Sequence, residues 1–216
     1  TADTHTPGVR IRPVTGVILA GGRATRYGGV NKAFVDVGGC RMLDRIYPVF
    51  KDLFNEIILV TNQPEAYLAW DLHIVTDLFP IRSSLAGVHA GLFHASTEHI
   101  FATACDAPFI EKAIVTEILS RIDDTCHTVM PEVAGMLQPL FAVYAKKCLP
   151  TIETALKNGR LQMFSLCRRD RTKTVSEKVL RRHDPDLSVF FNVNSPEDKA
   201  LADEKAKLRE MSKGMK

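Results

Sequence analysis

The sequence predicts a three-layer α/β/α fold in which helices cover both faces of a mostly parallel, twisted sheet. Short apolar segments rich in β-branched residues alternate along the chain with longer segments of helical periodicity. This alternation is typical of right-handed crossovers between parallel strands. The first apolar segment, residues 14–20, ends abruptly at Gly21-Gly22, as expected of a buried strand that leads into a turn at the edge of the sheet.

Six segments are short and apolar enough to form strands of this sheet. They are residues 14–20, 56–61, 72–76, 100–105, 128–130 and 140–144. Most of them are separated by stretches that favour helices. The predicted helices cover residues 41–54, 85–95, 111–122, 145–157 and 196–213.

Two of these helices carry a local signal. Pro48 lies inside the helix predicted for residues 41–54 and should kink or restart it, because proline has no backbone N–H to donate. The last helix has a typical start, with Ser195 as N-cap, Pro196 at the first helical position and Asp198 at the third.

Length and composition predict one globular domain. The chain has 216 residues, of which 45% are hydrophobic and 25% charged, enough for one sizeable core. Residues 1–13 show no periodicity, and we expect them to form a flexible tail. We expect residues 14–212 to form a single domain, since no linker or internal repeat interrupts them.

Charge, hydropathy and cysteine usage exclude several classes of protein. A net charge of +3 is too small to indicate a nucleic-acid or membrane partner. The apolar runs are much shorter than the roughly 20 residues of a membrane helix. The five cysteines never form a CxxC motif, which argues against structural zinc and disulfides, so we expect a cytoplasmic location.

The segment from 19 to 32 predicts a phosphate-binding loop. Four glycines alternate there with three cationic side chains; they are Gly21, Gly22, Gly28 and Gly29, with Arg23, Arg26 and Lys32. Glycines let backbone N–H groups approach an anion, and the cations neutralise its charge. The spacing matches neither a Walker A loop nor a GxGxxG fingerprint. The alternative is a glycine-rich surface turn with solvated cations.

Two aspartates follow predicted strands at equivalent positions. Asp77 comes after the strand at 72–76, and Asp106 after the strand at 100–105. Both should project from strand ends toward the rim that carries the glycine-rich loop. Mg²⁺ bound to a nucleotide takes one or two carboxylates in addition to phosphate oxygens, and Asp106 is the predicted ligand. The alternative for either residue is an ordinary turn or N-cap aspartate.

Other polar clusters have plainer interpretations. His89, His94 and His99 lack the spacing of a zinc helix, and we expect them on helix surfaces. The arginines at 168, 169 and 171 are expected to form a solvated basic face, with contact to an anionic substrate or a partner protein as the alternative.

Several motifs in the same order carry a resemblance to a known family. They are Leu19-Ala20-Gly21-Gly22 with Arg26, Gly28 and Lys32; Asp77 followed by Leu85-Ala86-Gly87; Cys105-Asp106-Ala107-Pro108-Phe109; Gln138-Pro139-Leu140; and the segment from Phe191 to Asp198. From Val14 to about Leu201 the chain resembles the molybdenum cofactor guanylyltransferases, the MobA-like branch of the nucleotidyltransferases. The resemblance implies a Rossmann-like sheet of the nucleotide-diphospho-sugar transferase type.

The resemblance also implies roles for individual residues. The backbone of the Leu-Ala-Gly-Gly turn, the side chain of Lys32 and the carboxylates of Asp77 and Asp106 would contact GTP, and Asp106 would also hold Mg²⁺. We expect Arg26 and Lys32 to neutralise the β- and γ-phosphates. We also expect Arg160, Asn192 and Asn194 to contact the acceptor, with turn and capping chemistry as the alternative for the asparagines.

Three positions differ from the family pattern. Ser83-Ser84 replaces a Gly-Pro pair, Asn31 replaces an acidic residue before the loop lysine, and Val60 stands where some relatives have a nucleotide-binding asparagine. Asn62 is the nearest amide that could substitute for that asparagine.

The implied activity is transfer of GMP from GTP to molybdopterin, with release of pyrophosphate. Such chemistry requires positioning and charge stabilisation and no covalent nucleophile. Transient contact with molybdoenzymes or their chaperones is a further expectation. Two alternatives stay open: a sister enzyme that uses CTP or a sugar phosphate, and a non-catalytic GTP-binding module.

Overall fold

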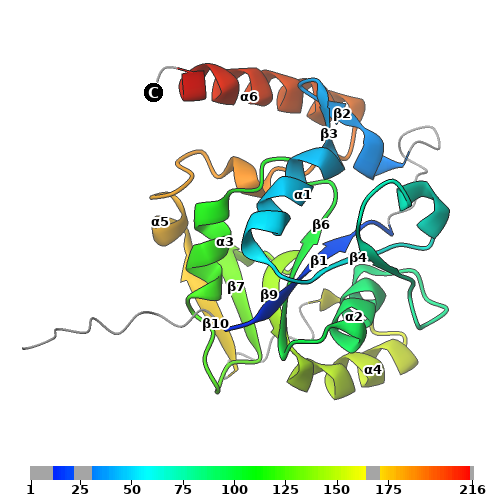
Figure 1. Cartoon of the computed structure of the whole chain (residues 1–216). Coiled ribbons are helices and arrows are strands. Elements are labelled where there is room, and N and C mark those ends of the chain that lie inside the picture. Colours follow the sequence, from blue (N-terminus) through cyan, green and yellow to red (C-terminus); the bar gives the residue numbers. More distant parts are fainter. Residues whose placement is uncertain (1–11, 22–30, 164–170, 215–216) are drawn as a thin grey trace, which may run out of the picture.

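A computed structural model describes residues 12–21, 31–163 and 171–214 of the chain (Figure 1). The expected α/β architecture is confirmed: one large sheet lies between two layers of helices. The strand order along the main path is β10-β7-β9-β6-β1-β4-β5. The strands are β1 (Val14–Leu19), β4 (Ile57–Val60), β5 (His73–Val75), β6 (His99–Ala104), β7 (Thr128–Val133), β9 (Phe141–Ala145) and β10 (Thr172–Ser176).

Most neighbouring strands run parallel. β1 pairs in parallel with β4 and β6, β4 with β5, and β7 with β10. β9 is antiparallel to both of its neighbours, β6 and β7. The short connection from β7 to β9 contains only β8 (Met136–Leu137), which pairs antiparallel with β7. A connection without a crossover helix must return the chain in the opposite direction.

The central strand β1 is buried on both faces, and its residues alternate between two cores. Val14 and Ile18 belong to one core, whereas Val17 and Leu19 belong to the other. This explains why the sequence reads as a continuous β-branched run and not as an alternating one.

Two helices cover each face of the sheet. α1 (Met42–Leu53) and α3 (Lys112–Leu119) pack on one face, and α2 (Ser84–His94) and α4 (Leu149–Lys157) on the other. α1 continues through Pro48 without a restart, contrary to one of the two expected outcomes. Shorter elements that the sequence did not predict are the hairpin β2 (Asp36–Val37) and β3 (Cys40–Arg41), the strands β8 and β10, the helix α5 (Glu177–Leu180) and three single turns: η2 (Lys32–Phe34), η3 (Pro64–Tyr67) and η6 (Ser188–Phe190). The helix predicted for residues 145–157 begins with a separate single turn, η4 (Lys146–Cys148).

The expected surface position of the α2 histidines is wrong for His89. Only 3% of His89 is exposed, because α2 is hydrophobic around its circumference and lies between the sheet and α4. Its ring packs edge-on against Phe79, 5.0 Å away between ring centroids. His99 is also buried and belongs to strand β6, not to a helix.

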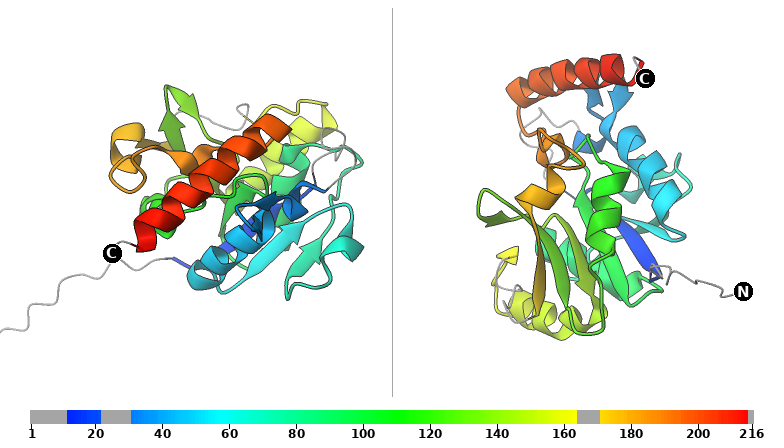
Figure 2. Two further views of the ribbon diagram at one scale, coloured as in Figure 1. Left: turned by 90° about the horizontal axis from the view of Figure 1, so that it is seen from above. Right: turned by 90° about the vertical axis from the view of Figure 1, so that its left-hand side faces the viewer.

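The last helix, α6 (Pro196–Gly214), crosses one end of the molecule beside β2 and β3 (Figures 1 and 2). Its Ala202 and Ala206 are buried in a third small core that also contains Val193. The predicted cap is present: Ser195 Oγ accepts from the backbone N–H of Asp198 at 3.1 Å, and the Asp198 carboxylate accepts from the N–H of Ser195 at 3.0 Å. Within the described ranges no helix combines the length and apolar character of a membrane span.

Candidate active site

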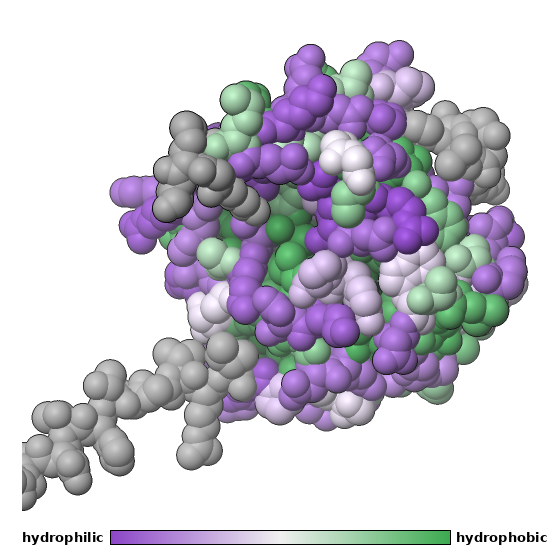
Figure 3. Space-filling view, turned by 45° about the horizontal axis from the view of Figure 1, so that its top comes forward, coloured by the Kyte–Doolittle hydropathy of each residue, from purple (hydrophilic) through white to green (hydrophobic). Residues whose placement is uncertain are grey.

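A cavity of about 280 Å³ opens where parallel strands end. It lies at the carboxyl ends of β1, β4 and β6 and at the start of α2. In the space-filling view, hydrophobic side chains at the bottom of a hollow are surrounded by hydrophilic ones (Figure 3). The lining residues are Leu19, Ala20, Gly21, Asn31, Lys32, Val60, Asp77, Arg82, Ser83, Ser84, Gly87, Ala104, Cys105, Asp106 and Leu140. Open α/β sheets bind their ligands at this edge.

The cavity brings together most of the residues singled out from the sequence. Leu19, Ala20, Gly21, Lys32, Asp77 and Asp106 all line it. Gly22 and Arg26, together with Arg23 and Gly28, lie outside the described residues. Arg160 and Asn192 are exposed and do not belong to the cavity lining, whereas Asn194 contacts Lys32 directly.

Lys32 connects two distant parts of the chain at one end of the cavity. Its Nζ donates to Oδ2 of Asp106 at 3.2 Å and to Oδ1 of Asn194 at 2.7 Å. The side chains of Lys32 and Asp106 are 16% and 19% exposed, so the pair is partly shielded yet open to the cavity. The backbone N–H of Val193 also donates to the carbonyl of Asp106 at 2.9 Å, which fixes the segment before α6 against the end of β6.

A buried tyrosine holds the backbone that carries Lys32. The Asn31 side-chain oxygen caps η2 by accepting from the N–H of Ala33 at 3.1 Å, and it accepts from the hydroxyl of Tyr67 at 3.0 Å. Tyr67 is fully buried and its ring lies 5.1 Å from that of Phe34, between centroids. Burial raises the pKa of the Tyr67 hydroxyl, so it stays a neutral donor. The amide at position 31 thus anchors the lysine loop.

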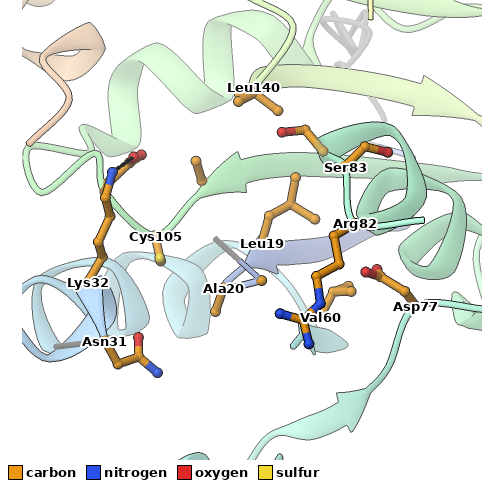
Figure 4. A pocket seen from close by; sticks show the side chains of 15 residues that line it. Leu19, Ala20, Asn31, Lys32, Val60, Asp77, Arg82, Ser83, Cys105 and Leu140 are labelled. Carbon is orange, nitrogen blue, oxygen red and sulfur yellow. Dashed lines mark hydrogen bonds and ion pairs between the residues drawn. The ribbon is translucent and has the colours of Figure 1, made fainter. Parts of the chain in front are cut away.

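Asp77 and Arg82, which carry opposite charges, lie at the other end of the cavity (Figure 4). The Asp77 carboxylate accepts from Nδ2 of Asn62 at 2.8 Å. Burial raises the pKa of Asp77 above its ordinary value of 3.8, while the Asn62 amide and the charge of Arg82 oppose the rise. The sequence pointed only weakly to Asn62 and missed Arg82 altogether, since an arginine in an irregular loop has no periodic signal.

The Ser83-Ser84 pair forms the start of α2. Ser83 Oγ accepts from the N–H of Ala86 at 3.1 Å and so caps the helix. One turn later Gly87 faces the cavity: a Cβ atom there would lie 3.1 Å from Cδ2 of Leu19 and 4.0 Å from Oδ1 of Asp77. The departure from Gly-Pro therefore supplies an N-cap at the edge of the cavity, and Gly87 keeps the cavity open.

The carboxylates of the cavity are suitable ligands for a metal ion that binds together with a nucleotide. Among the described residues no group of three or more His, Cys, Asp or Glu side chains could hold a metal by itself. Asp106 presents one hard carboxylate to the cavity, and nucleotide-bound Mg²⁺ needs only one or two carboxylates when phosphate oxygens and waters complete its coordination. The single carboxylate of Asp106 therefore suits an ion that is shared with the phosphate oxygens of a nucleotide.

The fold and the placement of charge at the strand ends define an α/β enzyme of the nucleotide-binding type. Residues 16–175 match the family model described as the MobA-like NTP transferase domain, and the chain belongs to this family of nucleotidyltransferases. The resemblance seen in the sequence motifs is thereby confirmed.

Known proteins support this assignment. The molybdenum cofactor guanylyltransferase of Desulfosudis oleivorans is 42% identical over 199 residues, covering 92% of this chain and 98% of that relative. Molybdopterin-guanine dinucleotide biosynthesis protein A of Archaeoglobus fulgidus superposes with a TM-score of 0.80 at 24% identity, covering 90% of this chain and 99% of that one. The 2-C-methyl-D-erythritol 4-phosphate cytidylyltransferase of Thermus thermophilus gives a TM-score of 0.66 at 20% identity over 90% and 99% of the two chains. The two structural likenesses show the shared fold.

Proposed function

We propose that the protein transfers GMP from GTP to molybdopterin and releases pyrophosphate. The observation that carries the proposal is the pair formed by Lys32 and Asp106, 3.2 Å apart, at the strand-end cavity. The 42% identity to a protein named molybdenum cofactor guanylyltransferase favours GTP and molybdopterin as the substrates.

In this reaction a terminal phosphate oxygen of molybdopterin attacks the α-phosphorus of GTP, and the bond from that phosphorus to the β-phosphate bridging oxygen breaks. Lys32 binds the phosphate chain and offsets the charge that develops on the departing pyrophosphate. Mg²⁺, held by Asp106 when bound, supplies further neutralisation of phosphate charge. The turn at Leu19, Ala20 and Gly21 places backbone groups beside the nucleotide.

Further residues are assigned within the same proposal. Asp77 contacts the nucleotide. Asn194 accepts from the same ammonium as Asp106, and this position beside Lys32 supports the proposal that Asn194 contacts the acceptor. Roles for Arg26 and Gly22 in phosphate binding, and for Arg160 and Asn192 at the acceptor, stay predictions from sequence. Residues 14–212 are proposed to act as one domain, which the hydrogen bond from the N–H of Val193, before α6, to the carbonyl of Asp106, after β6, supports. A cytoplasmic location and transient contact with molybdoenzymes or their chaperones also stay predictions.

A pyrophosphate-release assay with molybdopterin as acceptor tests the function. GTP, CTP, ATP and UTP are compared at saturating Mg²⁺. Of the four nucleotides, we expect only GTP to give appreciable turnover. Asp106→Asn should lower that turnover about 100-fold, the scale of losing one preorganised charged group. Release with CTP in preference to GTP would refute the guanylyl assignment, and undiminished turnover by Asp106→Asn would refute the role of Asp106.

A further inference from the structure

Arg82 is a charged residue of the cavity that the proposed chemistry leaves without a role. It belongs to the loop between β5 and α2, and its guanidinium points into the cavity on the side of Asp77 (Figure 4). It forms no hydrogen bond or ion pair with the other side chains drawn in that view. Lys32, by contrast, is already held by Asp106 and Asn194. Arg82 therefore offers a set of donors to a ligand.

The end of the cavity that Arg82 shares with Asp77 suits a base better than a phosphate. A carboxylate repels phosphate oxygens but accepts from N–H groups. Asn62 occupies Oδ2 of Asp77 at 2.8 Å, while Oδ1 faces Gly87, the side of the cavity that has no side chain to obstruct it. Leu19 and Val60 add apolar surface on which a flat ring can lie.

An arginine beside an aspartate matches the pattern of donors and acceptors on guanine. Guanine presents two acceptors, O6 and N7, next to the donors N1–H and N2–H₂. The planar guanidinium can donate to both acceptors, and a carboxylate can accept from both donors. Adenine carries a donor amino group where guanine has O6, so it would place donor against donor at the guanidinium.

We propose that Arg82 is a specificity-determining residue that donates to O6 and N7 of the guanine base of GTP. This inference rests on the proposed function, because it takes GTP as the nucleotide. Lys32 and Arg82 are the two cationic residues among the described lining residues. In this proposal Lys32 binds the phosphates and Arg82 recognises the base.

Equilibrium binding without acceptor tests the inference independently of turnover. The dissociation constants of GTP, 7-deaza-GTP, ATP and UTP are measured by calorimetry for the wild type, Arg82→Met and Arg82→Lys. Arg82→Met should weaken GTP binding about 5- to 150-fold, the range for one bidentate arginine–guanine contact, and leave ATP and UTP binding nearly unchanged. Arg82→Lys should restore little of this preference, since its ammonium lacks the planar fork.

The analogue 7-deaza-GTP tests whether Arg82 contacts N7 of the guanine base. Replacing N7 by carbon should weaken binding to the wild type about tenfold, and this penalty should vanish in Arg82→Met. Arg182→Met, at an exposed arginine outside the cavity lining, serves as the matched control. An equal loss for all nucleotides would make Arg82 a phosphate contact and overturn the inference, as would a 7-deaza penalty that persists in Arg82→Met. A wild type that binds GTP no better than ATP or UTP would refute the proposed function itself.

Discussion

The ammonium of Lys32 lies 2.7 Å from the side-chain oxygen of Asn194, although 162 positions separate the two residues in the sequence. The bond joins the loop after the first strand to the segment before the last helix. Because the same ammonium also contacts Asp106, the nitrogen is positioned by one neutral and one charged acceptor.

Removing Asn194 should therefore disturb the lysine without removing its charge. We expect Asn194→Ala to lower turnover about tenfold, comparable to the loss of one hydrogen bond to a charged group. Steady-state kinetics with GTP and molybdopterin measure the change. Asn158→Ala, at an exposed position at the end of α4, is the control and should retain full activity. Unchanged turnover in Asn194→Ala would show that Asp106 alone positions the lysine.

Removing the charge of Lys32 should lower turnover more than removing Asn194. Lys32→Ala is expected to lower turnover about 100-fold, because a preorganised cation at the phosphates is lost. Lys157→Ala, which removes an exposed lysine at the end of α4, is the control. Single-turnover measurements at saturating GTP separate the chemical step from binding. A variant that loses only GTP affinity would confine Lys32 to ground-state binding.

The contact between Tyr67 and Asn31 should support both stability and catalysis. Tyr67→Phe removes the hydroxyl that donates to Oδ1 of Asn31 at 3.0 Å and leaves the packed ring in place. We expect the free energy of unfolding to fall by about 1 kcal/mol. Turnover should fall several-fold, because the capped turn that begins at Lys32 loosens. Urea unfolding and kinetics on the same preparation test both effects, and a stability loss with unaltered kinetics would limit Tyr67 to a structural role.

Two glycines one turn apart on α2 should respond differently to alanine. At Gly91 a Cβ would lie 2.7 Å from Cγ1 of buried Val17, and the overpacking should cost about 1–3 kcal/mol of stability. At Gly87 the nearest atom is the flexible end of Leu19 at 3.1 Å, so stability should change little while the narrower cavity weakens GTP binding. Thermal unfolding and calorimetry compare the two variants. Equal destabilisation by both would contradict the assignment of Gly87 to the cavity.

Nucleotide binding should depend on the ionisation of Asp77. Burial raises the pKa of this carboxyl above 3.8, so its proton returns at a higher pH than for an exposed aspartate. The protonated form accepts hydrogen bonds less well, and GTP affinity should fall as the pH is lowered toward that raised pKa. The folding contribution has the opposite sign: a raised pKa adds stability at low pH and loses it as the pH rises. Asp77→Asn should bind GTP more weakly, and calorimetry at decreasing pH should give a flatter affinity profile than for the wild type, because the amide does not titrate.

The parts of the fold with a strong local signal could be predicted from the sequence. β1 and β6 are continuous β-branched or apolar runs, and Asp77 and Asp106 follow strands closely enough that their convergence could be expected. The edge strand β10 could not be predicted, because Val175 is the single buried residue of Thr172–Ser176. The reversed direction of β9 depends on the absence of a crossover helix and not on its own residues.

The site was less predictable wherever a side chain's direction depends on tertiary packing. Lys32 and Asp106 were expected to share a rim, but nothing local indicated that Asn194 would bond Lys32. Arg82 and Asn62 converge on Asp77 from two different loops. Arg160 and Asn192, selected by their positions near glycine and the last helix, are exposed outside the cavity lining.

The 2.7 Å bond from Lys32 to Asn194 also bears on how the enzyme matures on the ribosome. The loop with Lys32 is translated early, but its partner emerges only after 162 further residues. A nascent chain stalled before Asn194 already contains every strand of the described sheet but lacks the oxygen that orients the lysine. Catalytic competence should therefore arise as a late step of biosynthesis, after most of the α/β core has formed.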